Sequence, residues 1–78
     1  MAAEIIDVRG LGCGSVLVSL ATRRRSIDTA TPIVVWTDDA GAPEELPAWC
    51  RMTKQTFTGR VDDVDGAARY RLTLEPFV

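Results

Sequence analysis

Residues 9–15 form a glycine-rich turn between a strand-like run and a helix-like run, and they read Arg9-Gly10-Leu11-Gly12-Cys13-Gly14-Ser15. The turn carries one of the two cysteines in the chain. In the first turn of a helix the backbone N–H groups have no intrahelical acceptor, and the helix dipole is positive there. Both effects favour a thiolate over a thiol. The stretch therefore predicts that Cys13 is a reactive cysteine and that the rest of the chain holds it in place.

The segments on either side of the turn predict a strand and a helix. Residues 4–8 are rich in β-branched side chains and run directly into the turn, which is typical of a short strand. A helix is expected from about Ser15 to Arg25, with Ser15 or Cys13 as its N-cap. Val18 is expected at the edge of its buried stripe, and residues 23–25 in a solvated last turn. The stripe itself comprises four residues at helical spacing, namely Val16, Leu17, Leu20 and Ala21.

The second half of the chain predicts a strand, a helix and a hairpin. Residues 32–37 form a nearly continuous apolar run that begins with proline, as expected of a central strand. A second helix is expected to begin near Leu46 or Pro47, because an interior proline removes a backbone donor. Residues 55–62 and 67–75 predict two strands, joined by the turn dipeptide Asp65-Gly66.

This order of elements defines a fold class. The chain alternates strand, helix, strand, helix, strand, strand, which is a βαβαββ order. We expect an α+β two-layer sandwich, with a mixed four-stranded sheet and both helices on one face. A chain of 78 residues is long enough for one domain, so residues 1–78 are expected to form a single domain.

Composition and charge exclude several classes of function. The formal net charge is −2, which disfavours direct nucleic-acid binding, because phosphate neutralisation needs a basic surface. The chain has no histidine, so it lacks the commonest general base and metal ligand, and no metal or cofactor is expected. No apolar run approaches the ~20 residues that span a bilayer. No signal peptide is recognised at the N-terminus, so we expect no membrane association and a cytoplasmic location.

Several roles remain open for the other candidate residues. Cys50 lies on the apolar face of the second predicted helix, which favours a structural role over pairing with Cys13. Asp38 and Asp39 follow the central strand, where we expect turn or capping contacts rather than a metal pair. Trp36 and Trp49 are expected in the core.

Read together, these segments resemble the TusA/SirA/YedF-type sulfur-carrier family. The resemblance covers essentially the whole chain and differs at one motif. Where the family has Cys-Pro-x-Pro, this chain has Cys13-Gly14-Ser15-Val16, and glycine leaves the backbone freer than proline does. We therefore expect a more mobile loop and a later helix start. The matching segments are Asp7-Val8-Arg9-Gly10-Leu11-Gly12-Cys13, Thr37-Asp38-Asp39, Glu45-Leu46-Pro47-Ala48-Trp49-Cys50-Arg51 and Arg69-Tyr70-Arg71.

The resemblance implies a function and a set of partners. Cys13 would accept a sulfane sulfur as a persulfide from a donor protein, such as a cysteine desulfurase or a rhodanese-like protein. It would pass the sulfur to an acceptor protein in tRNA thiolation, a molybdenum-cofactor pathway or sulfur oxidation. Gly10, Gly12 and Gly14 would leave room for a partner's sulfur. Arg9 would assist the persulfide anion, although a fold-bracing role is at least as common for such an arginine.

Two other functions are compatible with the sequence. The chain could be a non-catalytic interaction or regulatory module that keeps the fold with a degenerate active loop. It could also be a redox-sensing protein in which Cys13 and Cys50 form a disulfide. The sulfur relay is preferred over both. Whether the chain is an enzyme in its own right, as a sulfurtransferase, or only a carrier is left open.

Overall fold

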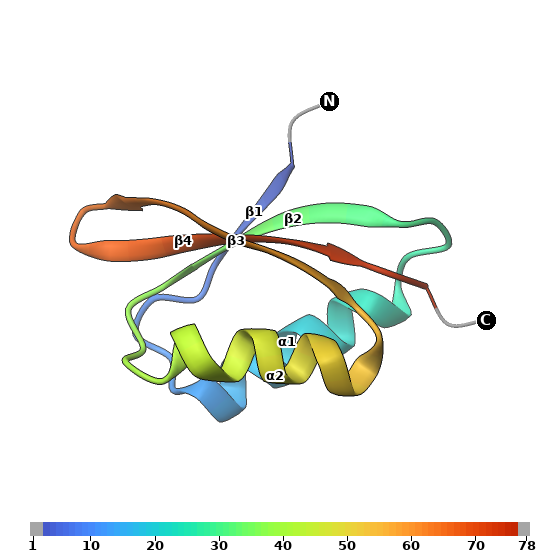
Figure 1. Ribbon diagram of the computed structural model, residues 1–78, viewed down its shortest axis with the longest axis horizontal. Coiled ribbons are helices and arrows are strands. Elements are labelled where there is room, and N and C mark those ends of the chain that lie inside the picture. Colours follow the sequence, from blue (N-terminus) through green and yellow to red (C-terminus); the bar gives the residue numbers. More distant parts are fainter. Residues whose placement is uncertain (1–2, 77–78) are drawn as a thin grey trace.

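The computed structural model describes residues 3–76, except for the side chain of Cys13. Its elements follow the predicted order (Figure 1). They are β1 (Glu4–Asp7), α1 (Cys13–Arg25), β2 (Thr31–Thr37), α2 (Ala42–Thr53), β3 (Thr56–Val64) and β4 (Ala67–Leu74).

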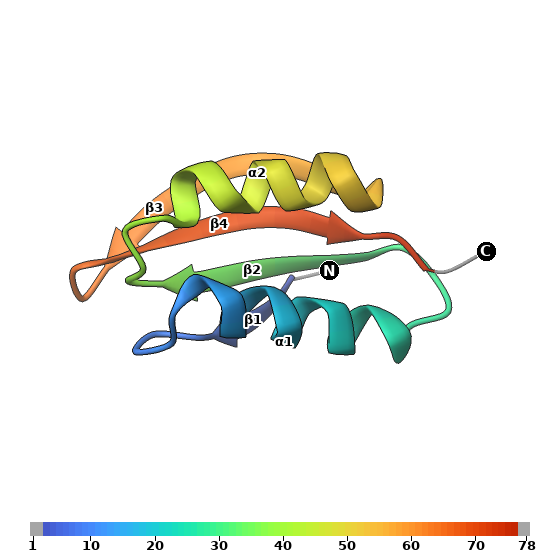
Figure 2. The same ribbon diagram turned by 90° about the horizontal axis from the view of Figure 1, so that it is seen from below.

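The four strands form one mixed sheet in the order β1-β2-β4-β3. β1 runs parallel to β2, with Ile5 opposite Val34, whereas β4 is antiparallel to both of its neighbours. Both helices lie against the same face of the sheet, as Figures 1 and 2 show. The predicted α+β two-layer sandwich with two helices on one face is therefore confirmed.

The core lies between the sheet and the helices. β2 alternates buried and half-buried residues, so that Ile33, Val35 and Thr37 face the helices. Tyr70, Leu72 and Leu74 do the same in β4, as their alternation with polar residues predicted. Burying each leucine fully stabilises the fold by roughly 2–3 kcal/mol. The buried apolar cluster comprises Val8, Val16, Leu20, Ile33, Val35, Ala42, Leu46, Cys50, Tyr70, Leu72 and Leu74.

Helix α1 ends at Arg25 as predicted, but its start and the burial of its last turn differ from the prediction. It begins at Cys13 rather than near Ser15, and its N-cap is Gly12, which makes no side-chain capping bond. Gly14 permits this start, because a proline there would disfavour a helical conformation at the residue before it. The prediction of a later start was thus wrong. In the last turn Arg25 is solvated as expected, whereas Arg23 and Arg24 are half-buried.

Those two arginines tie the far end of the helix to the ends of the sheet. Arg23 forms an ion pair with Glu4 of β1, and Arg24 Nε donates a hydrogen bond to the Glu75 carbonyl at 2.8 Å. The buried stripe of α1 is centred on Val16 and Leu20, as predicted. Val18 is 66% exposed and lies outside the stripe altogether, so its expected place at the edge was wrong.

Helix α2 begins four or five residues before its predicted start. Its first residue is Ala42, and Pro43 stands in the first turn, where a missing N–H costs no helical hydrogen bond. Ala42, Leu46 and Cys50 lie one turn apart and are all buried, which favours continuing the helix through Pro47. The lost hydrogen bond at Pro47 was therefore outweighed by packing. This is a burial effect that local propensity does not include.

Trp36 is the clearest exception to the predicted core. It lies on the sheet face opposite the helices, because its neighbours Val35 and Thr37 point toward them. Trp36 is half-buried there, and its indole Nε1–H donates to the Val64 carbonyl at 3.1 Å. Trp49 packs against the core from α2, as expected.

Candidate functional site

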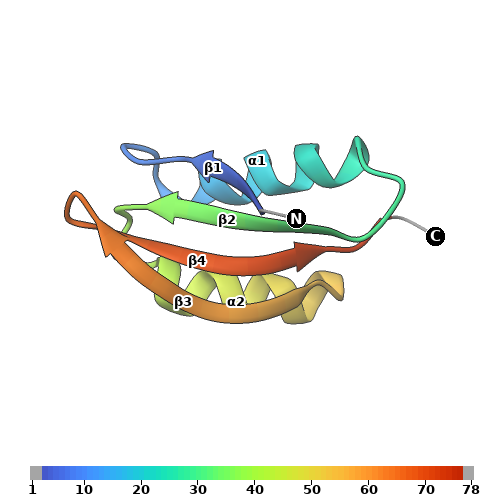
Figure 3. The ribbon, with the colours of Figure 1, turned by 90° about the horizontal axis from the view of Figure 1, so that it is seen from above.

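Three connections meet at one end of the sheet. They are the turn from β1 to α1, the loop from β2 to α2 and the β3–β4 hairpin, which Figure 3 shows together at the left. Because β1 and β2 are parallel, both strands present their carboxyl ends at this edge. The backbone of Cys13, the cysteine predicted to be reactive, therefore lies at the end of the sheet where loops distant in sequence can contact one another.

The turn after β1 requires glycine at position 10. Gly10 has a φ of 83°, in the left-handed region that favours glycine, and Leu11 N–H donates across the turn to the Val8 carbonyl at 3.2 Å. Val8 itself is buried, whereas Arg9, Gly10 and Leu11 are exposed. The chain thus leaves the core at Val8 and crosses the surface before the helix begins.

Helix α1 begins at Cys13, of which the structure describes the backbone. The first helical hydrogen bond runs from Val16 N–H to the Gly12 carbonyl at 3.0 Å, so the preceding N–H groups lie outside the helical ladder. No acidic residue stands in the first turn. A helix start of this kind favours an anion at its first residue. The Cys13 thiol, to which the sequence prediction applies, lies outside the described part of the structure.

The glycines around Cys13 leave open space. A Cβ built at Gly10, Gly12 or Gly14 would have no described heavy atom within 4 Å beyond the adjacent residues and the backbone of its own helix. Gly12, Gly14 and Ser15 are all exposed. The loop therefore has room for at least a Cβ atom at each of these positions.

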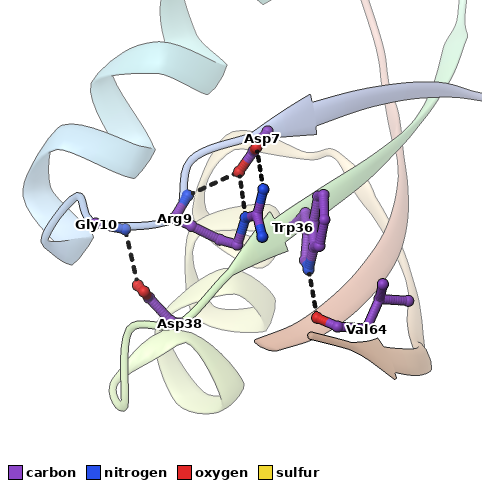
Figure 4. Close-up of polar contacts among 6 residues, drawn as sticks. All are labelled: Asp7, Arg9, Gly10, Trp36, Asp38 and Val64. Atoms are coloured by element: carbon purple, nitrogen blue, oxygen red, sulfur yellow. Dashed lines mark hydrogen bonds and ion pairs between the residues drawn. The ribbon is translucent and has the colours of Figure 1, made fainter. Parts of the chain in front are cut away.

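Arg9 is engaged on the open face of the sheet (Figure 4). Its Nε and Nη2 donate to the two carboxylate oxygens of Asp7 at 2.9 and 2.8 Å, and its guanidinium carbon lies 3.4 Å from the ring centroid of Trp36. The hydrogen-bonded Arg9 guanidinium lowers the pKa of Asp7 to about 2. These contacts brace the fold, which was one of the two roles expected of Arg9.

Asp38 and Asp39 each accept a backbone hydrogen bond, as expected of turn residues. Asp38 Oδ1 accepts the Gly10 N–H at 3.0 Å, and Asp39 Oδ2 accepts the Gly41 N–H at 3.0 Å. Among the described residues, no group of three or more carboxylates, cysteines or histidines could hold a metal ion. The contact between Asp38 and Gly10 spans two loops, and the sequence pattern did not predict it. The parallel pairing of β1 and β2 was the signal that could have indicated it.

An open cleft of about 500 Å³ lies beside this contact. Asp7, Arg9 and Gly10 line it from the β1 side, Asp38 from the β2 loop, and the hairpin turn completes it with Asp65, Gly66 and Ala67. The hairpin follows the predicted dipeptide, since Asp65 and Gly66 both have positive φ, at 53° and 79°. The sequence did not predict that the hairpin would line this cleft, because its position depends on the order of the strands in the sheet.

Cys50 lies elsewhere and in a different environment. It is 1% exposed within the core, and burial raises the pKa of its thiol to about 11. A buried, protonated thiol is a poor nucleophile. Its environment supports the structural role and disfavours the redox alternative, which requires Cys50 to react.

The fold and the cysteine loop define a class of protein. It is a small α+β sandwich in which a cysteine is the first residue of a helix and a glycine is the N-cap. Comparison with family sequence models agrees with this class. The model for Sulfurtransferase TusA matches residues 4–74, which is nearly the whole chain. The chain therefore belongs to the TusA family of sulfur carriers. A comparison with curated protein sequences finds no match. None of the helices in residues 3–76 is long and apolar enough to cross a membrane.

Proposed function

We propose that the chain is a sulfur-relay protein that carries a sulfane sulfur as a persulfide on Cys13. The observation that carries the proposal is the placement of Cys13 as the first residue of α1, behind a glycine N-cap and with no acidic residue in the first turn. Membership of the TusA family supports a sulfur-carrier role in general. The loss of both motif prolines leaves this helix start in place.

The chemistry needs a thiolate and access, but no general base. The Cys13 thiolate attacks the outer sulfur of a donor persulfide, a new S–S bond forms, and the S–S bond of the donor breaks. The donor cysteine leaves as a thiolate, so no net oxidation occurs. In the second step an acceptor thiolate attacks the outer sulfur on Cys13 and releases the Cys13 thiolate. The absence of histidine is compatible with both steps.

The surrounding residues have supporting roles in this proposal. Gly10, Gly12 and Gly14 keep side-chain bulk away from the approaching sulfur, in keeping with the open space around them. Arg9 assists indirectly, by bracing the turn through Asp7 and Trp36. The donor is a cysteine desulfurase or a rhodanese-like protein, the acceptor is a protein, and the location is cytoplasmic. The net charge of −2 disfavours direct binding of nucleic acid.

Intact mass spectrometry tests the proposal. The protein is incubated with a cysteine desulfurase and cysteine, or with a rhodanese and thiosulfate. We expect a gain of about 32 Da, one sulfur atom, on wild type and on Cys50→Ser, and no gain on Cys13→Ser. Absence of the adduct on wild type with both donors would contradict the relay and favour an interaction module. A loss of two hydrogens that requires both cysteines would indicate the redox function instead.

A further inference from the structure

Asp38 connects two loops at the cysteine end of the sheet through one hydrogen bond. Its Oδ1 accepts the Gly10 N–H at 3.0 Å, although the two residues are 28 positions apart in the chain (Figure 4). Asp38 follows β2, and Gly10 follows the parallel strand β1. The bond therefore links the loop after β1 to the loop after β2 at this end of the sheet, just before the chain enters α1.

The two partners of this bond are held to different degrees by their own surroundings. On the Asp38 side, Thr37 is 2% exposed, and its Oγ1 accepts the Asp39 N–H at 3.1 Å. On the Gly10 side, residues 9–12 are all exposed and two of them are glycine, although Arg9 is held to Asp7 and Leu11 N–H donates to the Val8 carbonyl. Asp38 thus attaches a glycine-rich surface segment to a well-braced loop.

We propose that Asp38 is a positioning residue for Cys13, which holds Gly10 and thereby sets how the chain enters α1. Only Leu11 and Gly12 separate Gly10 from the cysteine, so fixing Gly10 restricts the orientations open to the helix start. An ordered helix start keeps the first-turn N–H groups available to a thiolate at Cys13. This inference rests on the proposed function, but its test measures the reactivity of the Cys13 thiol and involves no sulfur transfer.

The hydrogen bond of Asp38 and its negative charge predict opposite shifts in the pKa of the Cys13 thiol when Asp38 is replaced. If the hydrogen bond matters, its removal disorders the helix start and raises the pKa of the Cys13 thiol. If only the negative charge matters, its removal lowers that pKa, because a nearby anion disfavours a thiolate. Asp38→Ala removes the acceptor and the charge, whereas Asp38→Asn keeps an acceptor oxygen and removes only the charge. Asp7, Arg9 and Asp65, the other charged residues that line the cleft, are unchanged in both variants.

The experiment measures alkylation of the full chain by iodoacetamide as a function of pH. Peptide mass spectrometry quantifies the Cys13 peptide separately from the buried Cys50. At pH 7 we expect Asp38→Ala to react about threefold more slowly at Cys13 than wild type, with the midpoint of its pH profile moved upward. Asp38→Asn is expected to stay within about twofold of wild type. Hydrogen exchange of the peptide that contains residues 9–14 should be about tenfold faster in Asp38→Ala only.

Asp39→Ala is the matched control. It removes a neighbouring carboxylate that also accepts a backbone N–H, but that N–H belongs to Gly41 rather than to the cysteine loop. We expect it to leave both Cys13 readouts unchanged. The proposal is overturned if Asp38→Ala behaves as wild type, if Asp39→Ala reproduces its effects, or if both Asp38 variants lower the midpoint equally. A failure of sulfur loading would leave these outcomes interpretable, since no sulfur donor is used.

Discussion

Gly10 and Gly14 lie on either side of the helix start and have different backbone requirements. Gly10 has a φ of 83°, where any side chain is strained, whereas no positive φ occurs at Gly14. Beyond the adjacent residues and the backbone of its own helix, a Cβ would meet no described heavy atom within 4 Å at either position. The two sites therefore separate backbone conformation from steric fit.

Alanine substitutions at these two glycines should change stability in opposite directions. Gly10→Ala is expected to destabilise the fold by about 1–2 kcal/mol through left-handed strain. Gly14→Ala is expected to stabilise it by about 0.5 kcal/mol, because the unfolded chain loses conformational freedom. Urea unfolding measures both. Equal shifts of the midpoint for the two variants would contradict the assigned conformations.

At the scale of elements, α2 contains two prolines with different consequences. Pro43 lies in the first turn, where its missing N–H has no helical acceptor. Pro47 lies one turn further on, where its missing N–H leaves the Pro43 carbonyl without its helical donor. The helix continues past Pro47 because Leu46 and Cys50 are buried on the same face.

Replacing these prolines tests that interpretation. Pro47→Ala restores a helical donor and should stabilise the fold by about 1 kcal/mol, after allowing for the greater freedom of the unfolded chain. Pro43→Ala restores no helical bond and should be neutral or destabilising by up to about 1 kcal/mol. Thermal unfolding followed by circular dichroism compares the two. A gain from Pro43→Ala that matches the gain from Pro47→Ala would contradict the placement of Pro43 in the first turn of the helix.

At the scale of the whole molecule, stability should depend on two ion pairs on the open face of the sheet. Asp7 pairs with Arg9 as described, and Asp62 accepts two hydrogen bonds from Arg69, both at 2.6 Å. The hydrogen-bonded guanidinium lowers the pKa of each carboxyl group, to about 2 for Asp7. Both groups are exposed, so their pairs are screened by solvent.

The sign of the resulting pH dependence follows from those lowered pKa values. Between the unfolded pKa near 4 and the folded pKa, the unfolded chain binds more protons, so stability is present above about pH 4 and falls toward pH 2. Asp7→Asn should make the fall of the urea midpoint shallower over this range, and Arg9→Leu should do the same by removing the donor. An acid limb as steep as that of wild type in both variants would contradict the pairing.

Residue patterns alone determined the order of elements, the buried stripe of α1, the alternating face of β4 and the hairpin at Asp65-Gly66. These features depend on local periodicity and turn chemistry, which neighbouring residues specify. The same patterns marked residues 9–15 as the candidate site, and the structure places the backbone of Cys13 as the first residue of a helix.

Only the tertiary structure decided where α2 begins, which face of the sheet Trp36 occupies and what holds the cysteine loop. The early start of α2 and the open face of Trp36 depend on burial against other elements. The contact between Asp38 and Gly10 depends on the parallel pairing of β1 and β2. Local sequence specifies a glycine-rich turn before Cys13. The position of that turn relative to the rest of the fold is set by a partner 28 residues away, which short-range patterns do not specify.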